Sequence, residues 1–548
     1  MRMKKVVGVA SLVVAVVTFI TAVLIVCPLL LRPADTSALA AESSVLDEIN
    51  GICGSSFEKD QYLTREEFCV VIAKVFIKTQ TESALPFVDL DEISPDSVGY
   101  LASLYEYNLL AGSLVDGRLY MLPDSMITRQ EAITLLGRLI NGTSDGAILG
   151  FSDVDKIAPY AYKFISWFVE RELIIGLPDG TIGPENVMTA EELAYLVSRT
   201  LEYRQSRVIS YMGTGMRGHA DGNIEIARFN LPHGLTVDKN GNLTVFDTYN
   251  NMIRVIKGNQ TDTLLGKIVQ YDDNGHPQGY FVDGKLEGAL VSRPTDGVYG
   301  GGGELFFTDS ANHVIKIISD DLLYTFTGRN LPGYADGDQQ TAMFNYPTAI
   351  AIDDNNNLYV ADTLNHCIRK VDGAGNVTTI AGTPKKGGYS DGAAGTATFL
   401  DPAGIAVSAD GKTVYVADTG NNLIRKIENG SVTTVAGAMS DKDSDGYPEG
   451  GFRDGAAGQA LFNQPKGIAL SNGSLYIADS GNHMIRMLDK AGVVKTICGG
   501  GEPGDEEDDL FGAVLNGAAD VLVYKGDLYI ADTLNNKVKV VILDTDVN

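Results

Sequence analysis

Residues 358–369 read LYVADTLNHCIR, and this stretch recurs with small changes along the chain after residue 206. A β-rich run precedes the aspartate, an Asp-x-x-Asn turn follows it, and a second β-rich run comes next. The aspartate returns every 53 to 62 residues, at Asp247, Asp309, Asp362, Asp418, Asp479 and Asp532. A period of this size with several short strands in each unit indicates a repeat fold.

Each unit holds two further strands. An apolar strand follows a proline upstream, as in residues 402–407, and another closes the unit, as in residues 432–437. Four short strands per unit, joined by Gly, Asn and Asp turns and repeated six times, predict an all-β six-bladed propeller. The last unit ends with its third strand, and residues 207–213 have the pattern of the missing fourth. We therefore expect residues 206–548 to form a propeller closed by its N-terminal strand, which leaves no open sheet edge.

The unit resembles the NHL repeat, most clearly over residues 358–369. The resemblance extends from residue 207 to residue 548 and implies the propeller fold. It implies little about function, because NHL propellers include binding scaffolds, lyases and RNA readers. We expect the repeated Asp and Asn side chains to build turns, since chemistry needs a group once whereas architecture needs it in every blade.

Strand parity places the Asp-x-x-Asn turns and the Gly-x-x-Asp-Gly linkers on one face of the propeller. The linker aspartates are Asp221, Asp283, Asp336, Asp391 and Asp454. We expect this face to be acidic, which disfavours RNA, and to present variable loops to a protein or glycan partner. His313, His366 and His483 occupy one repeat position that other units fill with Asn, so we expect a shared hydrogen-bonding role.

The propeller shows no catalytic constellation. His233 alone follows a proline at the mouth of the axis. The other units place Thr295, Thr348, Ala403, Lys466 and Ala518 there. The set of metal ligands that lyase relatives place around the axis is missing, and no Ser/His/Asp set stands out. We expect no enzyme activity; the alternative is a secreted lyase or lactonase with a metal on the propeller axis.

One irregular linker carries alternating carboxylates around a turn glycine, as calcium loops do. Its candidate ligands are Asp441, Asp443, Asp445 and Glu449. Phe452 stands where an EF-hand would place its bidentate Glu, so the segment is not an EF-hand. Calcium binding and a solvated acidic turn both remain open at this point, and no other cofactor is expected.

Residues 43–205 repeat a different unit. Phe87-Val-Asp89 returns as Phe151-Ser-Asp153, and a Gly…Asp-Gly…Pro turn follows each. Thr64, Thr128 and Thr189 each precede a Glu by three residues, which is the capping box of a helix N-terminus. Apolar residues at helical spacing come next. We therefore expect an α-helical module of three repeats, each with a helix, a turn and a second, capped helix.

These elements resemble the S-layer homology domain, a three-repeat helical module that holds proteins on the cell wall of Gram-positive-type bacteria. The resemblance implies that grooves between the repeats bind anionic secondary cell-wall polysaccharide, and that the Arg of Thr-Arg-x-Glu contributes. This role carries to Arg65 and Arg129, whereas the third repeat has Ala190. An arginine there adds charge to free N–H groups; the alternative is that both arginines pair with nearby carboxylates. Asp89 and Asp153 are further candidate glycan contacts that also fit turn caps.

The first residues predict an export signal. Basic residues precede an apolar run over residues 6–31, and the small-residue site Ala38-Leu-Ala40 follows. Cleavage after Ala40 is one outcome; an uncleaved membrane anchor is the other, and only that case brings contact with a membrane. We expect a cell-surface protein of a Gram-positive-type bacterium, held non-covalently on wall polysaccharide by residues 43–205 and displaying the propeller.

The composition excludes one class of partner. The 548 residues include 70 Asp and Glu against 43 Lys and Arg, a net charge of −27, so nucleic acid is not expected to bind. Of the five cysteines, Cys27 lies in the apolar run, and four do not make a disulfide framework. Cys53 and Cys69 leave room for one bridge. Trp167, the only Trp, is expected in a helix core.

Overall fold

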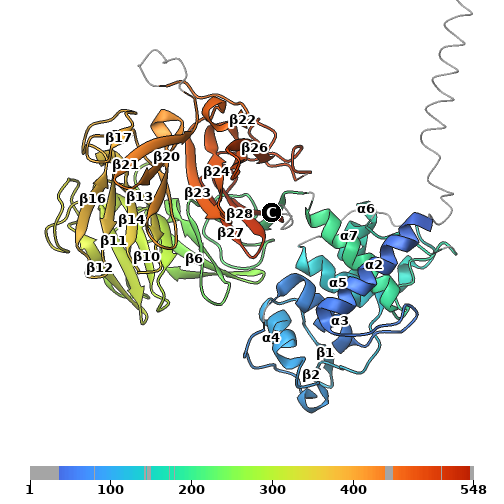
Figure 1. Cartoon of the computed structure of the whole chain (residues 1–548). Helices are drawn as coiled ribbons and strands as arrows, with labels where there is room; N and C mark the ends of the chain where they lie inside the picture. The colour runs from blue at the N-terminus through green and yellow to red at the C-terminus, as the bar shows by residue number, and fades with distance from the viewer. Residues whose placement is uncertain are drawn as a thin grey trace, which may run out of the picture.

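The computed structural model places a helical region beside a β-propeller (Figure 1). It describes residues 36–78, 80–140, 144, 150–171, 173–177, 179–205, 207–438, 448–507 and 509–542. Most of the expected export signal, residues 1–35, lies outside this set. Within the described residues, no helix is long and apolar enough to cross a membrane.

The helical region is built from short helices joined by turns. The helices are α2 (Thr36–Cys53), α3 (Arg65–Ile72), α4 (Val98–Glu106), α5 (Arg129–Leu139), α6 (Pro159–Glu170) and α7 (Ala190–Gln205). The short elements are the π-helix η1 (Ala73–Ile77), the 3-10 helices η2 (Leu90–Glu92) and η3 (Val154–Lys156), and a hairpin of β1 (Ser113–Val115) and β2 (Arg118–Tyr120). The three predicted capping boxes are formed, and they begin α3, α5 and α7.

The three capped helices start from a common point. The N–H of Leu63 donates to Met188 O at 3.1 Å, that of Met188 to Ile127 O at 3.0 Å, and that of Ile127 to Leu63 O at 3.0 Å. This closed ring of backbone bonds is fully buried and relates the repeats by an approximate threefold axis. Trp167 packs in the same core against Phe168 and Tyr203, as the sequence predicts.

The propeller has six antiparallel blades, which confirms the predicted fold. Blade one is β4 (Leu235–Val237), β5 (Leu243–Asp247), β6 (Met252–Lys257) and β7 (Gln260–Leu265). Blade two is β9 (Pro294–Tyr299), β10 (Leu305–Asp309), β11 (Val314–Ser319) and β12 (Leu322–Gly328). Blade three is β13 (Pro347–Ile352), β14 (Leu358–Asp362), β15 (Cys367–Val371) and β16 (Val377–Ala381).

The remaining blades follow the same order. Blade four is β18 (Gly404–Val407), β19 (Thr413–Asp418), β20 (Leu423–Glu428) and β21 (Ser431–Ala436). Blade five is β23 (Pro465–Ser471), β24 (Ser474–Asp479), β25 (Met484–Leu488) and β26 (Val493–Cys498). Blade six is β27 (Asp520–Tyr524), β28 (Asp527–Asp532), β29 (Lys537–Ile542) and β3 (Ile209–Met212). Two-residue strands extend blades two, four and five: β8 (Gly284–Lys285), β17 (Gly392–Ala393) and β22 (Gly455–Ala456).

Short 3-10 helices make the repeated Asp-x-x-Asn turns between the second and third strands. They are η4 (Thr248–Asn250), η5 (Ser310–Asn312), η6 (Thr363–Asn365), η7 (Thr419–Asn421), η9 (Ser480–Asn482) and η10 (Thr533–Asn535). One more, η8 (Ala457–Gln459), lies in the linker before blade five.

Strand β3 pairs antiparallel with β29 in blade six, with Met212 opposite Val538 and Ile209 opposite Val540. This pairing joins the beginning of the propeller to its last blade. Only residues 206–208 separate β3 from α7, so the strand lies next to the helical region. Ile209 and Val540 accordingly belong to the same apolar cluster as the helical core.

A buried ion network repeats in every blade, and blade four shows it clearly. Asp418 has no exposed surface; its carboxylate accepts hydrogen bonds from Leu400 N at 2.7 Å, Asn421 Nδ2 at 2.8 Å and Arg425 Nη1 at 2.6 Å. Arg425 also pairs with the linker residue Asp391 at 2.6 Å. The repeated Asp and Asn are therefore architectural, as predicted.

The expected acidic face needs a correction. Each inner aspartate is buried, and a buried cation lies between it and a linker aspartate whose side chain is less than half exposed. The cations are Arg254, Lys316, Arg369, Arg425, Arg486 and Lys539. In blade six the linker residue is Asp505, in an acidic run that the sequence pattern left unassigned. Half of the repeated carboxylates thus contribute no exposed charge.

The His and Asn residues that exchange at one repeat position share one role. His313 Nδ1 accepts the N–H of Tyr346 at 3.0 Å, and His483 Nδ1 accepts that of Gly517 at 3.0 Å. Asn422 Oδ1 accepts the equivalent bond from the next blade at 2.7 Å. The predicted hydrogen-bonding role is confirmed, and it ties each of these blades to its neighbour.

Candidate binding groove between the helical repeats

A groove lies between the first two capped helices, α3 and α5. Its polar lining residues are Arg65, Ser113, Glu131, Thr134, Arg138 and Tyr160, beside Cys69. Leu109, Leu110, Ile127 and Leu135 supply most of the apolar wall. The groove therefore combines charged groups with an apolar floor, which suits a ligand held by a few polar contacts.

Arg65 forms one wall of this groove and is largely buried, with 11% of its side chain exposed. Its Nε donates to Met121 O at 3.0 Å, and its Nη1 pairs with Glu131 of the next capping box. Arg129 repeats the arrangement, since its Nε donates to Ile182 O at 3.1 Å and its Nη1 pairs with Glu192 at 3.0 Å. The two predicted arginines thus join successive repeats through carboxylates, which was the alternative reading.

The N-terminal N–H groups beside these arginines are not free, contrary to the sequence-based argument. The N–H of Arg65 donates to Ser125 O at 2.8 Å, and that of Arg129 to Asn186 O at 2.9 Å. The next N–H in each helix donates to Pro123 O or Pro184 O. The loop of the following repeat supplies these carbonyls, because the threefold packing lays it across the helix start.

Asp89 and Asp153 lie in equivalent buried positions. The carboxylate of Asp89 accepts the N–H groups of Met121 and Leu122 at 2.8 and 2.7 Å. That of Asp153 accepts the N–H groups of Ile182 and Gly183 at 2.8 and 2.9 Å. Both oxygens of each carboxylate are therefore engaged in fixing the turn that leads to the next capped helix, and their predicted glycan contact stays a prediction.

Arg138, in the last turn of α5, is the groove residue that sequence reasoning missed. Its Nη1 donates to Leu109 O at 3.1 Å, and no carboxylate pairs with it among the described residues. Burial lowers the pKa of this guanidinium, which nevertheless stays charged at neutral pH. A signal existed: Lys74, Arg138 and Arg199 each follow the capping Thr by ten residues, so a cation recurs there in all three repeats.

Tyr160 lines the same groove as Arg138 and is 48% exposed. Burial of its hydroxyl is the main cause of its raised pKa. The exposed ring offers an apolar surface with a hydroxyl at its tip. A cation and an aromatic ring in one groove can hold an anionic, partly apolar ligand such as an acidic sugar.

The candidate calcium ligands Asp441, Asp443 and Asp445 lie outside the described residues. Glu449 is described and exposed. Over the part of the chain that the structure describes, no group of three or more His, Cys, Asp or Glu side chains is arranged to hold a metal ion. The calcium site stays a prediction.

The Cys53–Cys69 bridge that the sequence leaves possible is not formed. Both thiols are free, as are those of Cys367 and Cys498. Cys69 is buried on the groove side of α3, and burial raises the pKa of its thiol to about 12. Cys367 and Cys498 are buried apolar groups.

The inner strands of the propeller line an axial channel. Burial lowers the pKa of His233 to about 3, with Lys466 as a second cause. The pairing places Ala519, not Ala518, at the position of His233, because the N–H of Ala519 bonds to Ala531 O as that of His233 bonds to Phe246 O. Blade six lacks the proline that marks this position in the others, so the sequence count is shifted by one residue.

Two carboxylates line this channel that the sequence pattern did not predict there. Asp296 and Asp520 occupy the same position in blades two and six, on either side of blade one. Asp520 accepts the N–H of Leu235 at 2.8 Å, and Asp296 accepts that of Ile350 at 2.9 Å. Burial raises the pKa of Asp520 to about 7, while burial and the neighbouring Asp520 charge raise that of Asp296. No cation pairs with either side chain among the described residues.

The fold and the groove define a two-part protein: a helical repeat region with a cation-lined groove, joined directly to a six-bladed propeller. Residues 150–194 match the S-layer homology domain. Residues 344–371, 399–427 and 462–486 match the NHL repeat. The chain therefore carries an S-layer homology domain and NHL repeats, as the sequence resemblance predicts, and these matches support a surface-associated propeller protein.

Two curated relatives each match part of the chain. Protein SUPPRESSOR OF QUENCHING 1, chloroplastic, from Arabidopsis thaliana is 28% identical over 316 residues, which cover 54% of this chain and 30% of that protein. The Cellulosome-anchoring protein of Acetivibrio thermocellus is 29% identical over 165 residues, 28% of this chain and 35% of that protein. The chain thus spans about a third of the length of each. Among solved structures, the virginiamycin B lyase of Staphylococcus aureus superposes with a TM-score of 0.34 at 15% identity, covering 57% of this chain and 95% of that chain.

Proposed function

We propose that this protein is exported and held non-covalently on secondary cell-wall polysaccharide by residues 43–205, so that the propeller is displayed at the surface of a Gram-positive-type bacterium. The observation that carries the proposal is the groove lined by the exposed ring of Tyr160 and by the guanidinium of Arg138, which has no carboxylate partner among the described residues. S-layer homology domains generally bind cell-wall polysaccharide, and the match to the Cellulosome-anchoring protein supports the same role.

The two arginines of the groove have different roles. Arg65 is anchored to Met121 O and Glu131, so it shapes the wall that a polymer would meet. Arg138 retains hydrogen-bond donors that face the groove, and a guanidinium can bind a carboxylate or phosphate oxygen pair. We therefore assign the contact with the anionic groups of the polymer to Arg138 and the sugar-stacking contact to Tyr160.

Replacing Arg138 with Gln is expected to release the full-length protein from cell walls. A charge-assisted hydrogen bond contributes about 1.5–3 kcal/mol, so the apparent affinity falls by about tenfold or more. The measurement is co-sedimentation of the full-length protein with purified walls, before and after the secondary polysaccharide is stripped. Trp167 fluorescence checks that the helical core remains folded.

The matched control is Arg118→Gln, which removes the same charge from an exposed position of strand β2 outside the groove lining. It is expected to pellet like the unchanged protein. Equal losses in the two variants would show that overall charge, not the groove, holds the protein. Pelleting that survives removal of the polysaccharide would contradict the proposal as a whole.

For the propeller we propose a binding role, toward a protein or glycan. The alternative is a lyase or lactonase with a metal on the axis, and Asp296 and Asp520 are the observation in its favour. Small residues fill the other equivalent positions, namely Gly234, Ala349, Gly404 and Gly467. Because these four residues have no side-chain ligand atom, few ligands are available for an ion on the axis.

Equilibrium dialysis separates the two roles of the propeller. We expect no stoichiometric binding of Mg²⁺ or Ca²⁺ at the axial carboxylates Asp296 and Asp520. One ion per chain that is lost in both Asp296→Asn and Asp520→Asn would favour the enzyme. An ion retained in both variants would instead point to the acidic linker that contains Glu449.

A further inference from the structure

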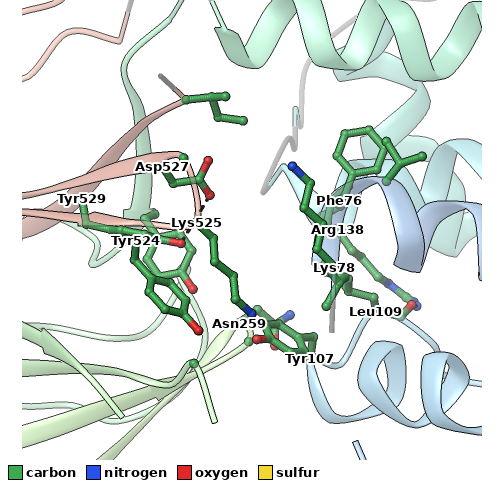
Figure 2. Close-up of a pocket in the computed structure, with 18 of the residues that line it drawn as sticks. Phe76, Lys78, Tyr107, Leu109, Arg138, Asn259, Tyr524, Lys525, Asp527 and Tyr529 are labelled. Carbon is green, nitrogen blue, oxygen red and sulfur yellow. Dashed lines mark hydrogen bonds between the residues drawn. The ribbon is translucent and has the colours of Figure 1, made fainter. Parts of the chain in front are cut away.

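A second pocket lies between the helical region and the propeller. Figure 2 shows Phe76 and Lys78 on the helical side facing Tyr524 and Lys525 on the propeller side, with the Arg138 guanidinium directed toward Leu109. The space amounts to about 1240 Å³ when its open mouth is included. Pockets that bind small ligands occur preferentially where two domains meet.

Close contacts hold the two walls of this pocket together. A Cβ on Gly258, in the turn after β6, would come within 2.3 Å of Tyr107 Cα, so the backbone of the propeller touches that of the helical region. Lys163 of α6 pairs with Glu225 of the propeller at 2.8 Å. Together with Ile209 in the helical core, these contacts fix the two parts against each other, and the pocket exists only where both are present.

Three cations line this space: Lys78, Arg138 and Lys525. None of them pairs with a carboxylate among the described residues, and Asp527 is the single acidic residue of the lining. The chain as a whole carries a net charge of −27, so a locally cationic cavity is a departure from its general character. A cavity of one sign with low-dielectric walls concentrates ligands of the opposite sign. The ligand class is therefore anionic.

Aromatic rings make up much of the rest of the lining. Tyr107, Tyr524 and Tyr529 expose rings and hydroxyls there, and Phe76 adds an apolar face. A sugar ring has apolar C–H faces and a polar rim, which matches rings that carry hydroxyls at their tips. The amide of Asn259 also lines the pocket, and its Oδ1 has no hydrogen-bond donor in the structure. A ligand hydroxyl would supply that donor.

The two lysines are held by unusual backbone. Lys78 ends the π-helix η1 with φ +58°, and Lys525 has φ +51° in the turn between β27 and β28. Left-handed backbone costs free energy in residues other than glycine, and such positions cluster at functional sites. Both lysines therefore project from turns whose direction is fixed.

We propose that this interdomain pocket binds an anionic saccharide of a few rings. The site adjoins the groove between the repeats, which shares Leu109 and Arg138 with its lining, and the proposal goes beyond wall anchoring. The negative groups of the saccharide contact Lys78 and Lys525, and its rings stack on the tyrosines. Since the walls come from both parts of the protein, the ligand also strengthens their contact.

The test is calorimetric titration of the full-length protein with trigalacturonate, which carries a carboxylate on every ring, and with neutral maltotriose. Trigalacturonate is expected to bind and maltotriose is not. The double variant Lys78→Asn, Lys525→Asn removes two charges, while Asn tolerates the left-handed backbone of both turns. Its affinity for trigalacturonate is expected to fall by at least about tenfold.

The control variant is Lys385→Asn, an exposed lysine of the propeller with φ +62°. It should bind trigalacturonate normally. Unchanged affinity in the double variant, equal binding of maltotriose, or stronger binding of AMP or inorganic phosphate would each overturn the proposal. Pelleting with cell walls should persist in the double variant, because Arg138 and the groove remain. Failure of this proposal can therefore be told apart from failure of wall anchoring.

Discussion

Arg425→Met lowers the free energy of unfolding of the propeller by about 3–5 kcal/mol, the cost typical of removing one partner of a buried ion pair. Arg425 has no exposed side-chain surface and joins Asp418 at 2.6 Å to Asp391 at 2.6 Å. Methionine fills much of the volume but cannot donate. Asp418 would then remain in the blade with two hydrogen bonds and no counter-charge.

Urea unfolding of the full-length protein, followed by circular dichroism of its strands, measures this loss as a shift of the propeller transition. The matched control is Lys412→Met, which breaks the pair between Lys412 and Asp410, whose side chains are 77% and 53% exposed. Exposed pairs contribute about 0–1 kcal/mol, so the free energy of unfolding of this variant should differ little from that of the unchanged protein. Equal shifts would mean that the blade network is as well solvated as the surface. A second substitution, Asp418→Asn, should recover part of the loss, since it removes the stranded charge.

Repetition explains why the propeller was predictable from sequence. The turn aspartates recur in every blade, so the pattern of a single unit is visible six times, and the His-for-Asn exchange could be interpreted as a hydrogen bond. The same logic predicted the capping boxes, whose Thr and Glu interact over three residues. Local contacts at a fixed spacing leave a signal in the sequence.

Contacts between segments that are distant in the sequence left a much weaker signal in it. Arg65 meets Glu131 across 66 residues, and the carbonyls that occupy the helix N–H groups come from a loop of the next repeat. Nothing in the local pattern showed that those N–H groups are engaged. The interdomain pocket is the extreme case, because Tyr107 and Tyr524 become neighbours only when the two parts dock.

The channel residues illustrate a third limit. Asp296 and Asp520 interrupt a position that is otherwise small, but the missing proline in blade six hid their equivalence. The hydrogen-bond register of the strands shows that the two positions are equivalent. Their burial without a cation then has a measurable consequence for stability, which the sequence could not indicate.

Asp520→Asn should make the stability of the propeller less dependent on pH. Burial raises the pKa of Asp520 to about 7 in the folded protein, against about 3.9 in an unfolded chain. Between these values the folded state binds more protons than the unfolded state, so the free energy of unfolding falls as pH rises through that window. The substitution removes this loss. We expect little effect near pH 4 and a stabilisation of about 4 kcal/mol near pH 8.

Urea unfolding at a series of pH values between those limits measures the slope. Asn at position 520 still offers an oxygen to the N–H of Leu235, so the strand contact at 2.8 Å survives the change. It also relieves Asp296 of the neighbouring charge that raises its pKa, which adds to the stabilisation at high pH. Asp262→Asn, at an exposed position of β7, is the control and should leave the slope unchanged. If the Asp520 variant were instead destabilised at pH 8, a bound cation would have to stabilise the carboxylate in the channel. That result would support a metal site on the propeller axis.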